Sequence, residues 1–147
     1  MGASKKFVNS RFARKGEYEK VIKAIIAAGH CPFCPENFRY HKNPILRKTK
    51  NWFITLSSWP YENSRLHFLI LSKKHKEKFE ELTLEDFKEI KSLAAWANKK
   101  YKIKGGGLTL RFGDTNHTGS TVAHLHFHLI APKLKNGKSL PVYFPIG

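Results

Sequence analysis

The chain has 147 residues, of which 41% are hydrophobic and 13% aromatic, which suits one folded domain and excludes global disorder. It contains no apolar run as long as a membrane span and no N-terminal secretory signal, so we expect a cytoplasmic protein. The formal net charge is +16, from 27 lysines and arginines against 11 acidic residues. Such a charge favours anionic partners such as nucleotides or nucleic acid.

The positive charge comes mainly from lysine, with 21 lysines and 6 arginines. Lysine is a hydrated point charge, whereas recognition of phosphates and bases more often uses the planar guanidinium of arginine. The simpler interpretation is a solvated, lysine-rich surface, and a nucleic-acid-binding surface is the alternative. We therefore expect any binding to nucleic acid to be weak and non-specific.

The beginning of the chain divides into two segments. Residues 1–14 are basic, lack periodicity and are expected to form a flexible arm. From Glu17 onward, apolar residues recur at spacings of three and four, which predicts a helix, and Gly29 is suited to end it. We expect residues 15–147 to form a single domain.

The middle and end of the chain predict four strands and one long helix. Segments 52–56 and 67–71 are predicted as strands, and the turn-forming residues between them predict an antiparallel pair. Thr83 to Asp86 resembles a capping box that starts a helix, whose expected apolar face is Phe87, Ile90, Leu93, Ala94, Ala97 and Tyr101. Two further strands are predicted over residues 108–112 and 123–130, so the fold class is α+β with an antiparallel sheet.

Three alternating histidines are the strongest functional signal. Side chains alternate between the two faces of a strand, so His124, His126 and His128 are predicted to share one face. The residues between them are apolar and are expected to face the core. Such a row suits either metal binding or phosphoryl chemistry with a neutral imidazole as nucleophile.

The loop before these histidines favours phosphoryl chemistry. Residues 113–121 are rich in glycine, hydroxyl groups and free backbone N–H groups, which is the composition of an anion-binding loop. Arg111 is predicted to share a strand face with Thr109. No role is predicted for His41.

These motifs resemble the histidine-triad (HIT) superfamily. The family pattern of three histidines separated by apolar residues matches residues 124–130, and the segment from His67 to His75 resembles the family's strand and loop, with Ser72 in place of the usual proline. The resemblance covers roughly residues 30–132. It implies an antiparallel sheet of about five strands with a long helix, an N-terminal helix and a zinc knuckle.

The resemblance also implies roles for individual residues. The middle histidine of the family attacks the α-phosphorus of a nucleotide derivative, which assigns that step to His126, and His128 helps hold the phosphate. The phosphate-binding residues correspond to Gly119, Ser120 and Thr121, where the family often has glutamine at the Ser120 position. Arg111 replaces an amide common in the family and suits a more negative substrate or leaving group. Trp59 lies near the ribose-contacting position of the family, and the alternative is that it belongs to the core.

The C-x-x-C motif leaves two interpretations. Two cysteines are too few for a four-cysteine metal site, so a metal here needs two ligands of another kind. Zinc-containing branches of the family use such a pair with two histidines, which implies a structural zinc site at Cys31, Cys34, His75 and His124. The alternative is a redox motif, but that fold has a strand before the cysteines, and here a helix precedes them.

The function implied by the resemblance is a nucleotidyl hydrolase or transferase with a covalent nucleotidyl-histidine intermediate. The candidate substrates are dinucleoside polyphosphates and nucleoside phosphoramidates. The alternative is a nucleic-acid-binding protein or an enzyme acting on adenylated nucleic-acid ends, because of the charge of +16 and the basic arm. Family members commonly dimerise through one continuous sheet, so a homodimer is expected. No membrane partner is expected.

Overall fold

The computed structural model describes residues 16–147, and the basic arm predicted at 1–14 lies outside them. Five strands form one antiparallel sheet in the order β1-β2-β3-β5-β4, and two more strands form a separate hairpin. The strands are β1 (Ile45–Lys48), β2 (Trp52–Leu56), β3 (Ser64–Ser72), β4 (Gly107–Leu110), β5 (His126–Pro132), β6 (Leu134–Lys135) and β7 (Lys138–Ser139). The α-helices are α1 (Glu17–Ala28), α2 (Leu84–Lys100) and α3 (Thr115–Thr118), with 3₁₀ helices at Pro35–Tyr40 and Phe79–Glu81. The expected α+β fold with five strands is confirmed.

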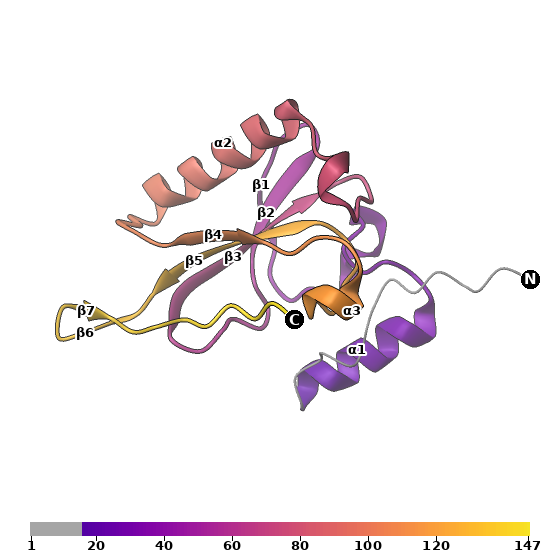
Figure 1. Ribbon diagram of the computed structural model, residues 1–147, viewed down its shortest axis with the longest axis horizontal. Coiled ribbons are helices and arrows are strands. Elements are labelled where there is room, and N and C mark those ends of the chain that lie inside the picture. The colour runs from indigo at the N-terminus through magenta and orange to yellow at the C-terminus, as the bar shows by residue number, and fades with distance from the viewer. Residues whose placement is uncertain (1–15) are drawn as a thin grey trace, which may run out of the picture.

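The two faces of the sheet are covered differently. Helix α2 lies across one face, whereas α1, α3 and the C-terminal segment, residues 140–147, lie on the other side (Figure 1). The main core lies under α2 and consists of Trp52, Ile54, Phe68, Ile70, Ile90, Leu93, Ala97, Phe127 and Leu129. A smaller cluster of Phe53, Leu69 and Leu71 lies on the opposite face and packs against Phe33 and Phe38.

Several predicted elements have the predicted bounds. Helix α1 starts at Glu17 and ends at Gly29, which adopts the left-handed conformation that favours glycine. Strand β2 spans the predicted residues and pairs with β3 in antiparallel fashion. The Thr83 hydroxyl accepts from the Asp86 N–H while the Asp86 carboxylate accepts from the Thr83 N–H, so the predicted capping box is present.

Other predictions need correction. The strand predicted at 108–112 ends at Leu110, and Phe112 is exposed. The strand predicted at 123–130 starts only at His126, because Leu125 N–H donates to the Lys76 carbonyl of a neighbouring loop rather than to a strand. Phe87 was expected on the buried face of α2 but is exposed and lies beside Phe79.

Strand β1 and the hairpin of β6 and β7 were not predicted. Each of these strands is short. In β1, the register with β2 shifts between Ile45 and Arg47, so the sequence of β1 shows no clear alternation of apolar and polar residues. Within residues 16–147, no helix combines the length and the apolar character that crossing a membrane requires.

A buried carboxylate joins α2 to the loop after β3. Asp86 accepts hydrogen bonds from the Trp52 indole N–H (2.8 Å), the Lys76 ammonium (2.7 Å) and the Thr83 N–H (2.8 Å). Burial alone would raise the pKa of Asp86, but these hydrogen bonds outweigh it and lower the pKa to about 2. The network therefore anchors the segment that follows His75.

We predict that Asp86→Asn destabilises the protein at pH 7 by about 2 kcal/mol, because the charged acceptor of four hydrogen bonds is lost. The pKa of Asp86 in the folded protein lies below its unfolded value of 3.8. The stabilisation by the ionised carboxylate is therefore present above pH 3.8 and disappears as the pH falls toward about 2. Urea unfolding between pH 7 and pH 3 measures the difference in the free energy of unfolding between the variant and the wild type. This difference should become smaller below pH 4.

The matched control is Glu85→Gln in the same helical turn. Glu85 is exposed and pairs at 3.7 Å with Lys88 on the surface, so its loss should change stability by less than about 0.5 kcal/mol. Equal urea midpoints for Asp86→Asn and wild type at pH 7 would contradict the assigned role of Asp86.

Candidate functional site

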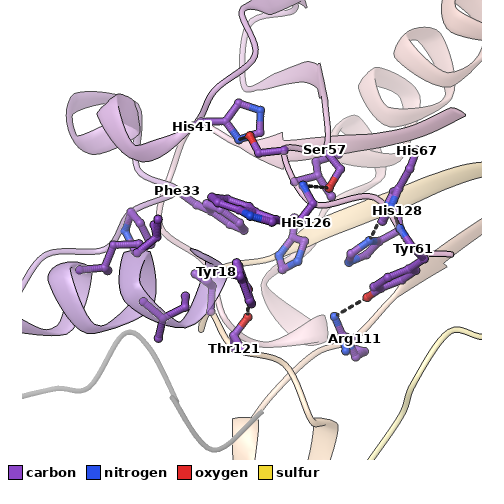
Figure 2. A pocket seen from close by; sticks show the side chains of 18 of the residues that line it. Tyr18, Phe33, His41, Ser57, Tyr61, His67, Arg111, Thr121, His126 and His128 are labelled. Carbon is purple, nitrogen blue, oxygen red and sulfur yellow. Dashed lines mark hydrogen bonds between the residues drawn. The ribbon is translucent and has the colours of Figure 1, made fainter. Parts of the chain in front are cut away.

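A pocket lies on the face of the sheet opposite α2, around two of the three histidines (Figure 2). Its walls come from α1, the segment after α1, the β2–β3 connection, the end of β4 and the loop before β5. The predicted residues Trp59, Arg111, Gly119, Thr121, His126 and His128 all line it. Further lining residues include Tyr18, Phe33, His41, Tyr61, His67 and Pro145.

His126 presents an unprotonated ring nitrogen to this pocket. Its Nδ1 lies 2.6 Å from the His124 carbonyl oxygen, and because a carbonyl can only accept, Nδ1 carries the proton. The remaining nitrogen, Nε2, then has the free lone pair. The pKa of His126 is lowered to about 3, mainly by burial and in part by the charge of Arg111, although the bond to the His124 carbonyl opposes both. The imidazole is therefore neutral at pH 7.

The tautomer of His128 follows from a chain of hydrogen bonds. The Tyr61 backbone N–H donates to His67 Nδ1 at 3.1 Å, so the proton of neutral His67 is on Nε2. His67 Nε2 lies 2.8 Å from His128 Nδ1 and donates to it. His128 consequently carries its own proton on Nε2, which is buried and has no hydrogen-bond partner among the described residues. Burial holds the pKa of His128 well below its usual value, so this N–H is a neutral donor next to the His126 ring, 4.9 Å away between ring centres.

Arg111 provides a fixed positive charge at the same pocket. Its guanidinium donates to the Pro145 carbonyl (3.1 Å) and to the Tyr61 hydroxyl (3.3 Å), and it lies over the Phe144 ring at 4.9 Å. The C-terminal segment therefore holds Arg111 in place, while Phe144 also contacts the His128 ring at 5.0 Å. Figure 2 shows Arg111 below Tyr61, on the same side of the pocket as His128.

The loop before β5 contributes two of its three predicted residues to the pocket. Gly119 and Thr121 line it, and the Tyr18 hydroxyl of α1 lies 2.6 Å from the Thr121 hydroxyl. Ser120 does not line the pocket, because it is buried and its hydroxyl donates to the Val122 carbonyl. Gly119 has a positive φ of 72°, and a side chain there would meet the backbone of Gly147, which lies 2.6 Å from an ideal Cβ.

The other end of the pocket is aromatic and contains hydroxyl groups. Trp59 lies 4.9 Å from the ring of Tyr18, which brings α1 against the β2–β3 connection. His41 donates from Nε2 to the Leu56 carbonyl at 2.8 Å and has Nδ1 3.2 Å from the Ser58 hydroxyl. Burial lowers the pKa of His41, so this end of the pocket presents a neutral imidazole.

The four predicted metal ligands come together in the structure. One ligand atom from each of Cys31, Cys34, His75 and His124 lies within 4.8 Å of the others. The closest pairs are Cys31 Sγ–His124 Nδ1 and His75 Nδ1–His124 Nδ1, both 3.3 Å, with Cys34 Sγ 3.6 Å from His75 Nδ1. These edges match a tetrahedron around a zinc ion, whose bonds of about 2.0–2.3 Å separate the ligands by roughly 3.3–3.8 Å.

The proton positions of the two histidines suit metal binding. His124 Nε2 donates to the Ser72 carbonyl at 2.7 Å, and His75 Nε2 lies 3.0 Å from the Glu77 carboxylate. Both rings therefore direct an unprotonated Nδ1 at the two sulfur atoms, which is the usual arrangement around a bound metal. Burial raises the pKa of Cys31 and raises that of Cys34 to about 12, so thiolates at this position require a cation beside them.

Comparison with known proteins identifies the family. The model of the HIT domain matches residues 43–134, which is more than half of the chain. The chain belongs to the HIT domain family. No protein with a curated description matches it.

Solved structures share the fold of this HIT domain. The histidine triad nucleotide-binding protein from Candida albicans has 25% sequence identity and a TM-score of 0.60 over 80% of this chain and 85% of that one. A zinc-bound histidine triad family protein from Mycobacterium smegmatis has 18% identity and a TM-score of 0.55 over 78% and 83%. The diadenosine triphosphate hydrolase of Plasmodium falciparum, solved with cyclomarin A, has 21% identity and a TM-score of 0.51 over 65% of each chain.

Several pocket residues of this HIT domain were not predicted from the sequence. Phe33, between the two cysteines, packs edge-to-face on the His126 ring, with 4.9 Å between the ring centres. Tyr61 stacks at 5.7 Å on His128, although its segment suggested only a turn. No local pattern marks Phe144, which reaches the ring of His128 from the C-terminal segment. His67 was identifiable only as part of the family motif.

Proposed function

We propose that this HIT domain is a nucleotidyl hydrolase or transferase that acts on the α-phosphate of nucleotide derivatives. The observation that supports it best is the unprotonated Nε2 of His126, which faces the pocket beside a neutral N–H donor on His128. A neutral imidazole with one free nitrogen is the form in which histidine acts as a nucleophile.

The reaction has two steps. The lone pair of His126 Nε2 attacks the α-phosphorus, a P–N bond forms, and the bond from phosphorus to the leaving group breaks with its electron pair. The His128 Nε2–H donates a hydrogen bond to a phosphate oxygen and stabilises the developing charge. In the second step, water or another acceptor attacks the phosphorus, the P–N bond breaks, and His126 is restored. The acceptor loses one proton to the solvent.

The substrate-binding roles follow the placement of the residues. Arg111 is positioned to contact phosphate oxygens with a planar, permanently charged guanidinium. The backbone of Gly119 and the hydroxyl of Thr121 form the phosphate side of the pocket. Ser120 holds this loop in place through the hydrogen bond from its hydroxyl to the Val122 carbonyl. Trp59 forms the wall at the nucleoside end.

Two substrate classes are compatible with this pocket, dinucleoside polyphosphates and nucleoside phosphoramidates. The diadenosine triphosphate hydrolase among the structural relatives gives indirect support to the first class. A panel of both classes with each of the common bases, followed by intact mass measurement, identifies the base through the mass of the nucleotidyl adduct.

We predict that His126→Asn lowers kcat by roughly 10⁴-fold or more and abolishes the nucleotidyl adduct, because the attacking nitrogen is removed. His128→Asn should be milder, since it removes a donor to the phosphate and leaves the nucleophile. Rapid-quench kinetics and intact mass on the selected substrate measure both effects.

The control for this series is His117→Asn, which changes an exposed histidine of α3 that does not line the pocket. It should retain wild-type turnover. A His126→Asn protein that still forms the adduct at the wild-type rate would exclude His126 as the nucleophile.

We also propose that Cys31, Cys34, His75 and His124 bind one structural zinc ion. Four protein ligands close a tetrahedral site, which leaves no position for substrate and makes the role structural. The ligands join the segment after α1, the loop after β3 and the start of β5. They therefore also fix Phe33 against His126.

Elemental analysis of protein purified without added metal should give one zinc per chain. Cys34→Ser should lose the metal and melt roughly 10 °C or more lower, because metal binding is part of the folding free energy. A chelator should destabilise the wild type and leave the metal-free variant unchanged. Absence of zinc together with a Cys31–Cys34 disulfide would contradict the proposal.

We further propose that the protein forms a homodimer through the outer edge of β4. Of the two edge strands, β1 carries Arg47 and Lys48, which discourage pairing, whereas β4 carries no charge and exposes Leu108. Antiparallel pairing of β4 with a second copy satisfies its backbone groups around a two-fold axis.

We predict that Leu108→Lys converts the dimer to a monomer, because it places like charges at the two-fold interface. Light scattering after size exclusion measures the mass, against a wild-type value of twice 16.9 kDa. Ile26→Lys, at an exposed position on α1, serves as the control and should remain dimeric. A monomeric wild type at micromolar concentration would refute this interface.

A further inference from the structure

A second cavity, of about 820 Å³, lies beside the pocket of His126 and His128 on the same face of the sheet. We call it the basic groove, and the lining residues that matter here are Arg65, Lys102, Lys104, Gly106, Thr109 and Phe144. Its volume is within the range of small-molecule binding sites.

The basic groove continues the pocket along β4 and β5. Residues at every second position of β5 share a face, so Ile130, which lines the groove, follows His126 and His128 on that face. On the neighbouring strand, Thr109 lies opposite His128, and Gly107 lies opposite Ile130. Arg111 therefore stands at the end of β4 next to the pocket, and the lysines stand at the other end.

Phe144 lies between the pocket and the groove. Its ring lies 5.0 Å from His128 in the pocket, and the same residue lines the groove. A leaving group that departs from the α-phosphate on the Arg111 side would pass this ring and reach the groove.

The charged side chains that line the groove are all positive. It is lined by Arg65, Lys102 and Lys104, and no acidic side chain of the described residues lines it. Some lysines elsewhere on the surface pair with carboxylates, as Lys23 does with Glu19 at 3.1 Å and Lys88 with Glu85 at 3.7 Å. The groove is thus a cavity in which three positive side chains gather without an acidic neighbour in its lining.

Two further features fit an anionic ligand. The Thr109 hydroxyl is buried and has no hydrogen-bond partner among residues 16–147, so a ligand oxygen could satisfy it. Gly106 packs so closely on β5 that an ideal Cβ would lie 2.3 Å from the Ile130 carbonyl oxygen. This close packing holds the loop that carries Lys102 and Lys104 against the groove.

We propose that the basic groove binds the phosphates of a polyanionic leaving group. The inference rests on the proposed nucleotidyl transfer to His126 and specifies its substrate class: a nucleotide whose leaving group carries several phosphates. A phosphoramidate releases an amine, which gains nothing from this groove. The phosphates can belong to a polyphosphate chain or to the end of an oligonucleotide, and both place negative charge along the same path.

The test compares the triple variant Arg65→Ala/Lys102→Ala/Lys104→Ala with Lys88→Ala/Lys91→Ala/Lys99→Ala. The second variant removes the same charge from exposed positions on α2, across the sheet from the groove. Each protein, in its metal-bound form, is assayed with diadenosine tetraphosphate, a 5′-adenylated oligonucleotide and adenosine phosphoramidate, or the equivalents of whichever base the panel selects.

The groove variant should lose roughly tenfold in kcat/KM on the polyanionic substrates, as expected for three exposed ionic contacts, and should keep wild-type activity on the phosphoramidate. Its loss should shrink as salt rises from about 50 to 200 mM. A loss on diadenosine tetraphosphate alone assigns the groove to polyphosphate chains, and a loss on the oligonucleotide alone assigns it to nucleic-acid ends. The α2 control should match the wild type on all three.

Equal losses on all three substrates, or no loss on any, would overturn the proposal. Calorimetric titration with inorganic tripolyphosphate distinguishes failure of the groove proposal from failure of the proposed function. If the wild type turns over none of the substrates, nucleotidyl transfer is wrong, whereas tripolyphosphate affinity that is equal in the groove variant and the control shows that the groove is not a phosphate site.

Discussion

Two residues of β5, Phe127 and Leu129, are buried in the hydrophobic core under α2, and the arrangement of the pocket on the other face depends on that burial. Because side chains alternate along a strand, His126 and His128 must then face the opposite side. A slip of one residue would expose two large apolar side chains and bury the imidazoles in the core, so the register is strongly determined. The core thus positions the two histidines that line the pocket, although neither histidine contributes to it.

The backbone at the start of β5 links the pocket to the cysteine–histidine cluster. The carbonyl of His124 accepts the proton of His126 Nδ1, while the His124 ring directs its own Nδ1 at Cys31. One residue therefore sets the tautomer of the proposed nucleophile and provides a ligand of the cluster. Phe33, between the two cysteines, covers the His126 ring from the same side. A bound metal would stabilise the active arrangement of His126 without contacting the substrate.

Local patterns in the sequence predicted α1, β2 and α2 but not β1, β6 or β7, and the four residues of the cysteine–histidine cluster followed from the family resemblance. The spacing of apolar residues and Gly29 gave α1, and the Thr83 capping box gave α2. The start of β5 was placed too early because the Leu125 N–H donates to the Lys76 carbonyl, a tertiary contact that no alternation reveals. Contacts of Tyr61 and Phe144 with His128 were missed for the same reason, since they join residues 67 and 16 positions away in the chain. Segment 140–147 has no periodicity from which its path could be predicted.

Hydrogen bonding, rather than charge, determines which nitrogen of each histidine faces the substrate. Long-range ¹H–¹⁵N NMR of the zinc-loaded protein at pH 7, assigned with single histidine variants, observes the proton on each ring directly. We expect neutral His126 with its proton on Nδ1, and neutral His67 and His128 with theirs on Nε2. A proton on His126 Nε2, or a doubly protonated His126 ring at this pH, would contradict it.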